Sequence, residues 1–191
     1  MKPRARPGVT MRPAQFVAID FETADQGLDS ACAVALVRVE ALKIVERKSC
    51  LIRPPRQSFE FTYLHGISWE TVADQPSFAD VWPTLCPTLE GVSFLAAHNA
   101  SFDQGVLEAC CRRAGIQPPA LPFKCTVELA RRTWNIYPTK LPNVCARLGV
   151  PLKHHDPCSD AEACARIMIA ALSSGDTKHV AQRRRVGRVS R

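Results

Sequence analysis

Two carboxylates, Asp20 and Glu22, lie two positions apart in the segment 16–23 (FVAIDFET). The apolar residues before them predict a buried strand, in which alternate side chains point to the same face. Asp20 and Glu22 would therefore project together, with Cα atoms roughly 6.6 Å apart. Two ionised carboxylates this close repel each other, and a divalent cation would remove the repulsion. A strand that runs into a polar turn is the simpler explanation for an isolated pair, so a site requires further ligands.

A third acid, Asp103, follows another apolar strand candidate at 92–98 (VSFLAAH). Ser101, with Gln104 three residues later, is typical of a helix N-cap. This spacing puts Asp103 in the first turn of the helix, near its positive end. An acid at that position stabilises a helix even without any further function.

The last helix brings a fourth acid and a histidine. Ser159 and Glu162 form a capping-box pattern, which predicts Asp160 at the first helical position. His155 lies five residues before Asp160, on the loop that enters this helix. Because strand ends and helix starts gather at one edge of an α/β sheet, we expect the four acids and His155 to meet there.

The remaining pattern predicts one α/β domain at 14–172. Strands are expected at 16–23, 31–39 and 44–53, and the short connection 40–43 favours an antiparallel meander. Short helices are expected at 127–134 and 141–148. The segments 1–13 and 173–191 are basic, and we expect both to be disordered.

Composition limits the class of protein. Among 191 residues, 46% are hydrophobic and 23% charged, which is typical of a soluble globular protein. No apolar run is long enough to cross a bilayer, and no apolar region follows the basic start as in a secretory signal, so we expect a cytoplasmic location. The net charge of +7 is concentrated in the two end segments, which either attract nucleic acid or are simply solvated.

Cysteine usage gives no sign of a metal site or a disulfide framework. The chain has nine cysteines, an odd number, and no C-x-x-C motif. Most lie within apolar stretches, where a cysteine acts as a small hydrophobic residue.

Three segments, AIDFET, AHNASFD and HHDPCSD, resemble the three exonuclease motifs of the DEDD superfamily. The H-x-x-x-x-D spacing that ends at Asp160 is that of its DEDDh branch. The chain is similar over residues 15–172 to the proofreading epsilon subunit of bacterial DNA polymerase III and its stand-alone relatives. This resemblance implies a ribonuclease-H-like fold, with a mixed five-stranded sheet whose first three strands are antiparallel and which is flanked by helices.

The resemblance also implies roles for particular residues. Two divalent metal ions, Mg²⁺ or Mn²⁺, would be held by Asp20, Glu22, Asp103 and Asp160. His155, rather than His154, would be the general base, and His154 and Cys158 would be bystanders. Contacts to the terminal nucleotide would come from Thr23, His65 and Phe102, although for Phe102 a place in the core is nearly as well supported.

The implied function is a metal-dependent 3′–5′ exonuclease acting on single-stranded DNA or RNA 3′ ends, with DNA preferred and DNA repair as a possible setting. The alternatives are an RNA-trimming enzyme like ribonuclease T or oligoribonuclease, or a non-catalytic nucleic-acid-binding accessory subunit. We do not expect association with a polymerase, because the basic end segment 173–191 offers little apolar surface to a partner. No membrane contact is expected, and the oligomeric state stays open.

Overall fold

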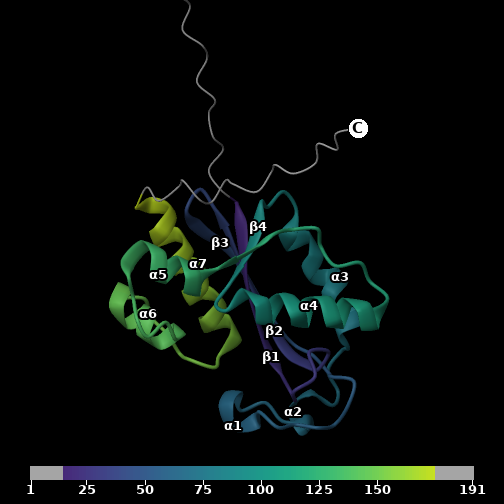
Figure 1. Cartoon of the computed structure of the whole chain (residues 1–191). Coiled ribbons are helices and arrows are strands. Elements are labelled where there is room, and N and C mark those ends of the chain that lie inside the picture. Colours follow the sequence, from purple (N-terminus) through teal and green to yellow (C-terminus); the bar gives the residue numbers. More distant parts are fainter. Residues whose placement is uncertain (1–14, 175–191) are drawn as a thin grey trace, which may run out of the picture.

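The computed structural model describes residues 15–174. Within this range five strands form one mixed sheet in the order β3-β2-β1-β4-β5 (Figure 1). The strands are β1 (Phe16–Thr23), β2 (Ala31–Glu40), β3 (Lys43–Leu51), β4 (Phe94–Ala97) and β5 (Phe123–Cys125). The first three are antiparallel, and β4 and β5 run parallel to β1. The predicted ribonuclease-H-like α/β sheet is confirmed.

Helices cover both faces of the sheet (Figure 1). The helices of the described chain are α1 (Thr62–His65), α2 (Trp69–Val72), α3 (Phe78–Leu85), the 3-10 helix η1 (Cys86–Leu89), α4 (Ala100–Ala114), α5 (Thr126–Trp134), α6 (Leu141–Leu148) and α7 (Pro157–Ser173). Of these, α1 and α2 lie beyond one end of the sheet (Figure 1). The predicted basic segments lie outside the described residues, except for Ser173 and Ser174. No helix of the described chain is long and apolar enough to span a membrane.

The central strand β1 is buried on both faces, which explains its continuous apolar sequence. On one face Val17 and Ile19 pack in a core with α3 and α4. On the other face Phe16 and Ala18 pack in a second core with α5 and α7. Because side chains pack against both faces of β1, the strand is held in place. Residues at its carboxyl end therefore have defined positions.

The β2–β3 hairpin turns through only two residues, Ala41 and Leu42, because Glu40 pairs with Lys43. Both turn residues have positive φ, 48° and 63°. Two-residue hairpin turns of this kind favour Asn and Gly, so the fold holds an Ala-Leu pair in an unfavourable conformation here.

Two predicted helix starts were wrong, one by two residues and the other by three. Helix α4 begins at Ala100, and its N-cap is Asn99 in the left-handed conformation, so Ser101 lies inside the first turn. Helix α7 begins at Pro157 after the N-cap Asp156, whose side chain accepts a hydrogen bond from Ser159 N.

The predicted capping box of α7 therefore does not form, and Asp160 is the fourth helical residue instead of the first. Glu162, its expected second member, pairs with Arg47 and Arg166. Proline is favoured at the first helical position, which explains why the helix starts at Pro157.

Candidate active site

The site begins where β1 ends. Asp20 and Glu22 are both half-buried near that end. Asp20 pairs with Ala35 and Glu22 with Ala33 of β2, and the register shifts between Glu22 and Thr23. Both carboxylates therefore lie on backbone that is paired with β2, just before the register shift.

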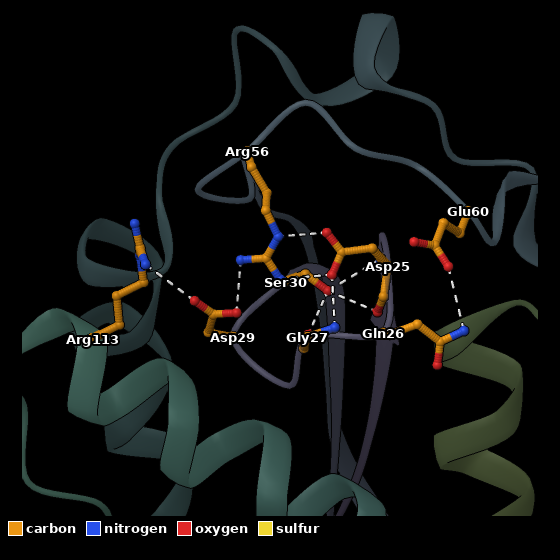
Figure 2. A network of polar contacts seen from close by, with 8 residues as sticks. All are labelled: Asp25, Gln26, Gly27, Asp29, Ser30, Arg56, Glu60 and Arg113. Carbon is orange, nitrogen blue, oxygen red and sulfur yellow. Dashed lines mark hydrogen bonds and ion pairs between the residues drawn. The ribbon is translucent and has the colours of Figure 1, made fainter.

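The loop that follows, 24–30, is tied down by a polar network (Figure 2). Arg56 lies between Asp25 and Asp29 and donates to both carboxylates, while Arg113 of α4 also contacts Asp29. Gly27 lies so close to Arg56 that a Cβ there would overlap the guanidinium. These contacts fix the path of the chain immediately after the two acids.

Asp103 reaches the same strand end from the first turns of α4. Its side chain is almost fully buried, and Oδ1 accepts a hydrogen bond from Phe21 N at 3.1 Å. Phe21 lies between Asp20 and Glu22, so this bond locks the start of α4 to the acid-bearing end of β1.

Asp160 completes the cluster from α7. Ligand oxygens of Asp20, Glu22 and Asp160 lie within 4.8 Å of one another, and Asp103 is outside this close group. Asp160 Oδ2 accepts hydrogen bonds from His155 N at 3.1 Å and from His154 Nδ1 at 3.0 Å. Asp160 Oδ1 is buried and has no hydrogen-bond partner among the described residues.

Burial raises the pKa of all four acids, and repulsion from neighbouring carboxylates adds to this for Asp20, Glu22 and Asp103. Burial raises the pKa of Glu22 to about 7, with a further contribution from Asp160. Burial also raises the pKa of Asp103 to about 8, against the hydrogen bond from Phe21 N. The pKa of Asp20 rises through burial first and then through the other three carboxylates, and burial is also the main cause of the raised pKa of Asp160.

Such a cluster fits divalent cations. An unpartnered buried oxygen and several repelling carboxylates are costly without a positive charge between them. Carboxylate oxygens are the ligands that Mg²⁺ and Mn²⁺ prefer. The chemistry of the donor set thus agrees with the expected cofactor.

The two histidines before α7 stack on each other, with ring centroids 3.9 Å apart. His155 has a positive φ of 66°. His154, which was predicted to be a bystander, contacts Asp160 through its ring. The pair His154-His155 is evident in the sequence. A loop has no periodic pattern, however, so the sequence does not indicate which of the two histidines contacts Asp160. Cys158 packs at the edge of a core, in line with its predicted role as a bystander.

The three predicted substrate contacts lie on different elements. His65 at the end of α1 accepts from Ile67 N through Nδ1, which leaves Nε2–H to donate to Thr23 O at 3.2 Å. Burial lowers the pKa of His65, consistent with a neutral ring. Phe102, in the first turn of α4, is 39% exposed, so it does not belong to the core.

Comparison with known proteins agrees with this geometry. An exonuclease family model matches residues 17–168. Exodeoxyribonuclease 10 of Escherichia coli K12 is 34% identical over 168 residues, covering 82% of this chain and 68% of that protein. A solved structure of exonuclease X in complex with 5′ overhanging duplex DNA is 28% identical, with a TM-score of 0.68 over 84% of this chain and 93% of that one.

The DNA polymerase III PolC-type protein of Oceanobacillus iheyensis is 32% identical over 158 residues, or 80% of this chain. Those residues are only 11% of the polymerase, so the chain spans a small part of the length of the PolC-type relatives it matches. By its motifs, its sheet and its family match, the chain belongs to the RNase T exonuclease family, in the DEDDh branch of 3′–5′ exonucleases.

Proposed function

We propose that this protein is a metal-dependent 3′–5′ exonuclease that releases nucleoside 5′-monophosphates from single-stranded DNA ends. The observation that carries the proposal is the convergence of Asp20, Glu22 and Asp160. One buried carboxylate oxygen of Asp160 has no hydrogen-bond partner in the described part of the chain. A protein that only binds nucleic acid gains nothing from buried carboxylates, because they repel the phosphate backbone.

Asp20, Glu22, Asp103 and Asp160 would hold two divalent ions. When bound, these ions supply charge stabilisation to the scissile phosphate and increase the acidity of the attacking water. Asp103 contributes a second function, since its bond to Phe21 N keeps the two acids of β1 in place.

His155 is the proposed general base. Burial, followed by the nearby His154, lowers its pKa, although Asp160 opposes the shift. The imidazole is therefore neutral at pH 7 and can take a proton from the attacking water. Its backbone N–H is bonded to Asp160, which keeps the base beside the proposed metal ligands.

Thr23, His65 and Phe102 are the proposed contacts to the terminal nucleotide. The hydrogen bond from His65 to Thr23 O joins α1 to the end of β1. These two residues would therefore form one side of the proposed nucleotide site. The exposed ring of Phe102 offers an aromatic face, on which a base of any identity can stack.

The preference for DNA is supported by the relatives: exodeoxyribonuclease 10 is similar over most of its length, and exonuclease X was solved with DNA. A role in DNA repair would follow from such an activity. To test the preference for DNA, matched DNA and RNA oligonucleotides, single-stranded and 3′-recessed, are incubated with the protein and Mg²⁺ or Mn²⁺. We expect mononucleotide release to be faster from DNA; faster release from RNA would favour an RNA-trimming enzyme.

The assigned residues are tested by Asp20→Ala and Asp160→Ala, with the exposed Asp74→Ala as a matched control. We expect both site variants to lose at least about 10³-fold in kcat, while circular dichroism shows the native fold and Asp74→Ala keeps full activity. Wild-type rates in either site variant would exclude the metal site. Calorimetric titration without uptake of ions by the wild type would instead favour a non-catalytic accessory protein.

A further inference from the structure

The two oxygens of the Asp160 carboxylate have different surroundings. Oδ2 receives two hydrogen bonds, from the His154 ring and from the His155 backbone. Oδ1 is buried and has no hydrogen-bond partner within residues 15–174. Because a carboxylate with one oxygen held by two donors has little rotational freedom, the free oxygen is held in a fixed position beside Asp20 and Glu22.

His154 reaches this position through a tight local arrangement. Its ring stacks on His155 at an interplanar angle of 24°. The two histidines lie in a turn closed by a hydrogen bond from Asp156 N to Lys153 O at 3.2 Å, and His155 has a positive φ. The ring of His154 and the backbone N–H of His155 both bond Asp160 Oδ2. His154 is itself 39% exposed, so packing in a core does not explain its placement.

We propose that His154 is a positioning residue of the metal site, whose Nδ1–H holds Asp160 Oδ2 so that Oδ1 is ready to bind a cation. This inference rests on the proposed function. In this role His154 acts through Asp160 and does not itself contact metal or substrate. Loss of a residue that is hydrogen-bonded to a metal ligand typically lowers metal affinity or activity about 10- to 100-fold.

Stacking and hydrogen bonding by His154 can be separated with two substitutions. His154→Asn places a side-chain N–H close to the position of Nδ1 and loses the ring. His154→Phe keeps an aromatic ring against His155 and loses the donor. His179→Phe, at a histidine outside the described residues, is the control for the loss of an imidazole.

The primary measurement is Mn²⁺ binding to the full chain by calorimetry, without nucleic acid. We expect His154→Phe to weaken Mn²⁺ binding about 10-fold or more, and His154→Asn to stay within about 3-fold of the wild type. With a DNA oligonucleotide at fixed Mn²⁺ below saturation, kcat of His154→Phe should fall about 10-fold, with KM within about 2-fold. Thermal unfolding in EDTA checks that each variant folds, and His154→Ala replaces His154→Phe if the latter does not.

Two results of the Mn²⁺ titrations would overturn the proposal. Wild-type Mn²⁺ affinity in His154→Phe would show that the hydrogen bond positions nothing. An equal loss in His154→Phe and His154→Asn would show that the imidazole itself is needed, as for a direct metal ligand. Because binding is measured without substrate, a wild type that binds Mn²⁺ but releases no nucleotide contradicts the proposed function alone and leaves the His154 comparison intact.

Discussion

At the scale of single residues, the site places several carboxylates close together in buried or half-buried positions, where a negative charge is poorly solvated. Asp103 and Asp160 are almost fully buried, and the pKa of each of the four acids is raised. Each carboxylate therefore destabilises the metal-free protein, and the site is a place where function opposes stability.

This opposition predicts the behaviour of Asp20→Asn. In EDTA the variant should unfold about 2–4 °C above the wild type, because a carboxylate that three neighbouring carboxylates repel is removed, at a gain of about 1 kcal/mol. With saturating Mn²⁺ the order should reverse, since only the wild type is stabilised by binding. Differential scanning calorimetry with and without Mn²⁺ measures both. A lower melting temperature for Asp20→Asn in EDTA would contradict the assumed repulsion.

At the scale of elements, the loop 24–30 depends on Arg56. Its guanidinium bonds both oxygens of Asp25, whose side chain is 7% exposed, and also reaches Asp29. Hydrogen bonds from the Arg56 side chain are the main reason why the pKa of Asp25 is lowered. Arg56 thus contacts two carboxylates of the loop that follows β1, whereas Arg113 contacts one.

Arg56→Gln should destabilise the protein by about 1–2 kcal/mol at pH 7, because charged hydrogen bonds are lost but Arg56 is itself partly exposed. Asp25 has a lowered pKa in the folded state, so its contribution is complete above about pH 4 and is lost as the pH falls further. Urea unfolding at pH 7 and at pH 3 should therefore show a smaller difference between variant and wild type at pH 3.

Arg113→Gln is the control for Arg56→Gln, since Arg113 contacts only Asp29 within this network and is 57% exposed. We expect a change below about 0.5 kcal/mol. Equal losses in the two arginine variants, or a difference that does not depend on pH, would refute the assigned role of Asp25.

The β2–β3 hairpin gives a prediction of the opposite sign. Replacing Ala41→Asn and Leu42→Gly together should stabilise the protein by about 1 kcal/mol, since both residues hold positive φ and Asn-Gly suits such a turn. Chemical denaturation measures the gain. Nuclease activity should not change, because the turn lies at the opposite end of β2 from the residues that pair with Asp20 and Glu22. A loss of stability would mean that Leu42 packs better than its exposure suggests.

At the scale of the whole molecule, charge is distributed unevenly. The segment 175–191 contains six Lys and Arg against one Asp, while the site is acidic. Deleting 175–191 should flatten the dependence of KM on salt concentration for a DNA oligonucleotide, because fewer phosphates are neutralised on binding. The slope of log KM against log salt concentration is measured by kinetics between about 50 and about 200 mM salt, where such effects are strong. An unchanged slope would exclude this segment from binding.

The local sequence pattern by itself determined the antiparallel meander of the first three strands and the candidate acids, whereas the five-stranded sheet was implied by the family resemblance. Unbroken apolar strands, a hairpin-sized connection and acids at strand and helix ends are local features, and local features can be read along the chain. The helix starts at Ser101 and Ser159 were misplaced because several residues near each start can act as caps, and the choice among them depends on the surrounding fold.

The tertiary structure decided how the acids are held. The bond from Phe21 N to Asp103 joins residues 82 positions apart, and its formation depends on how α4 packs against β1. The contact between His154 and Asp160 depends on the reversal of the chain at His155, which no sequence pattern predicts. Residue types determine which chemistry is available, whereas the orientation of a carboxylate follows from packing and hydrogen bonds that exist only in the folded protein.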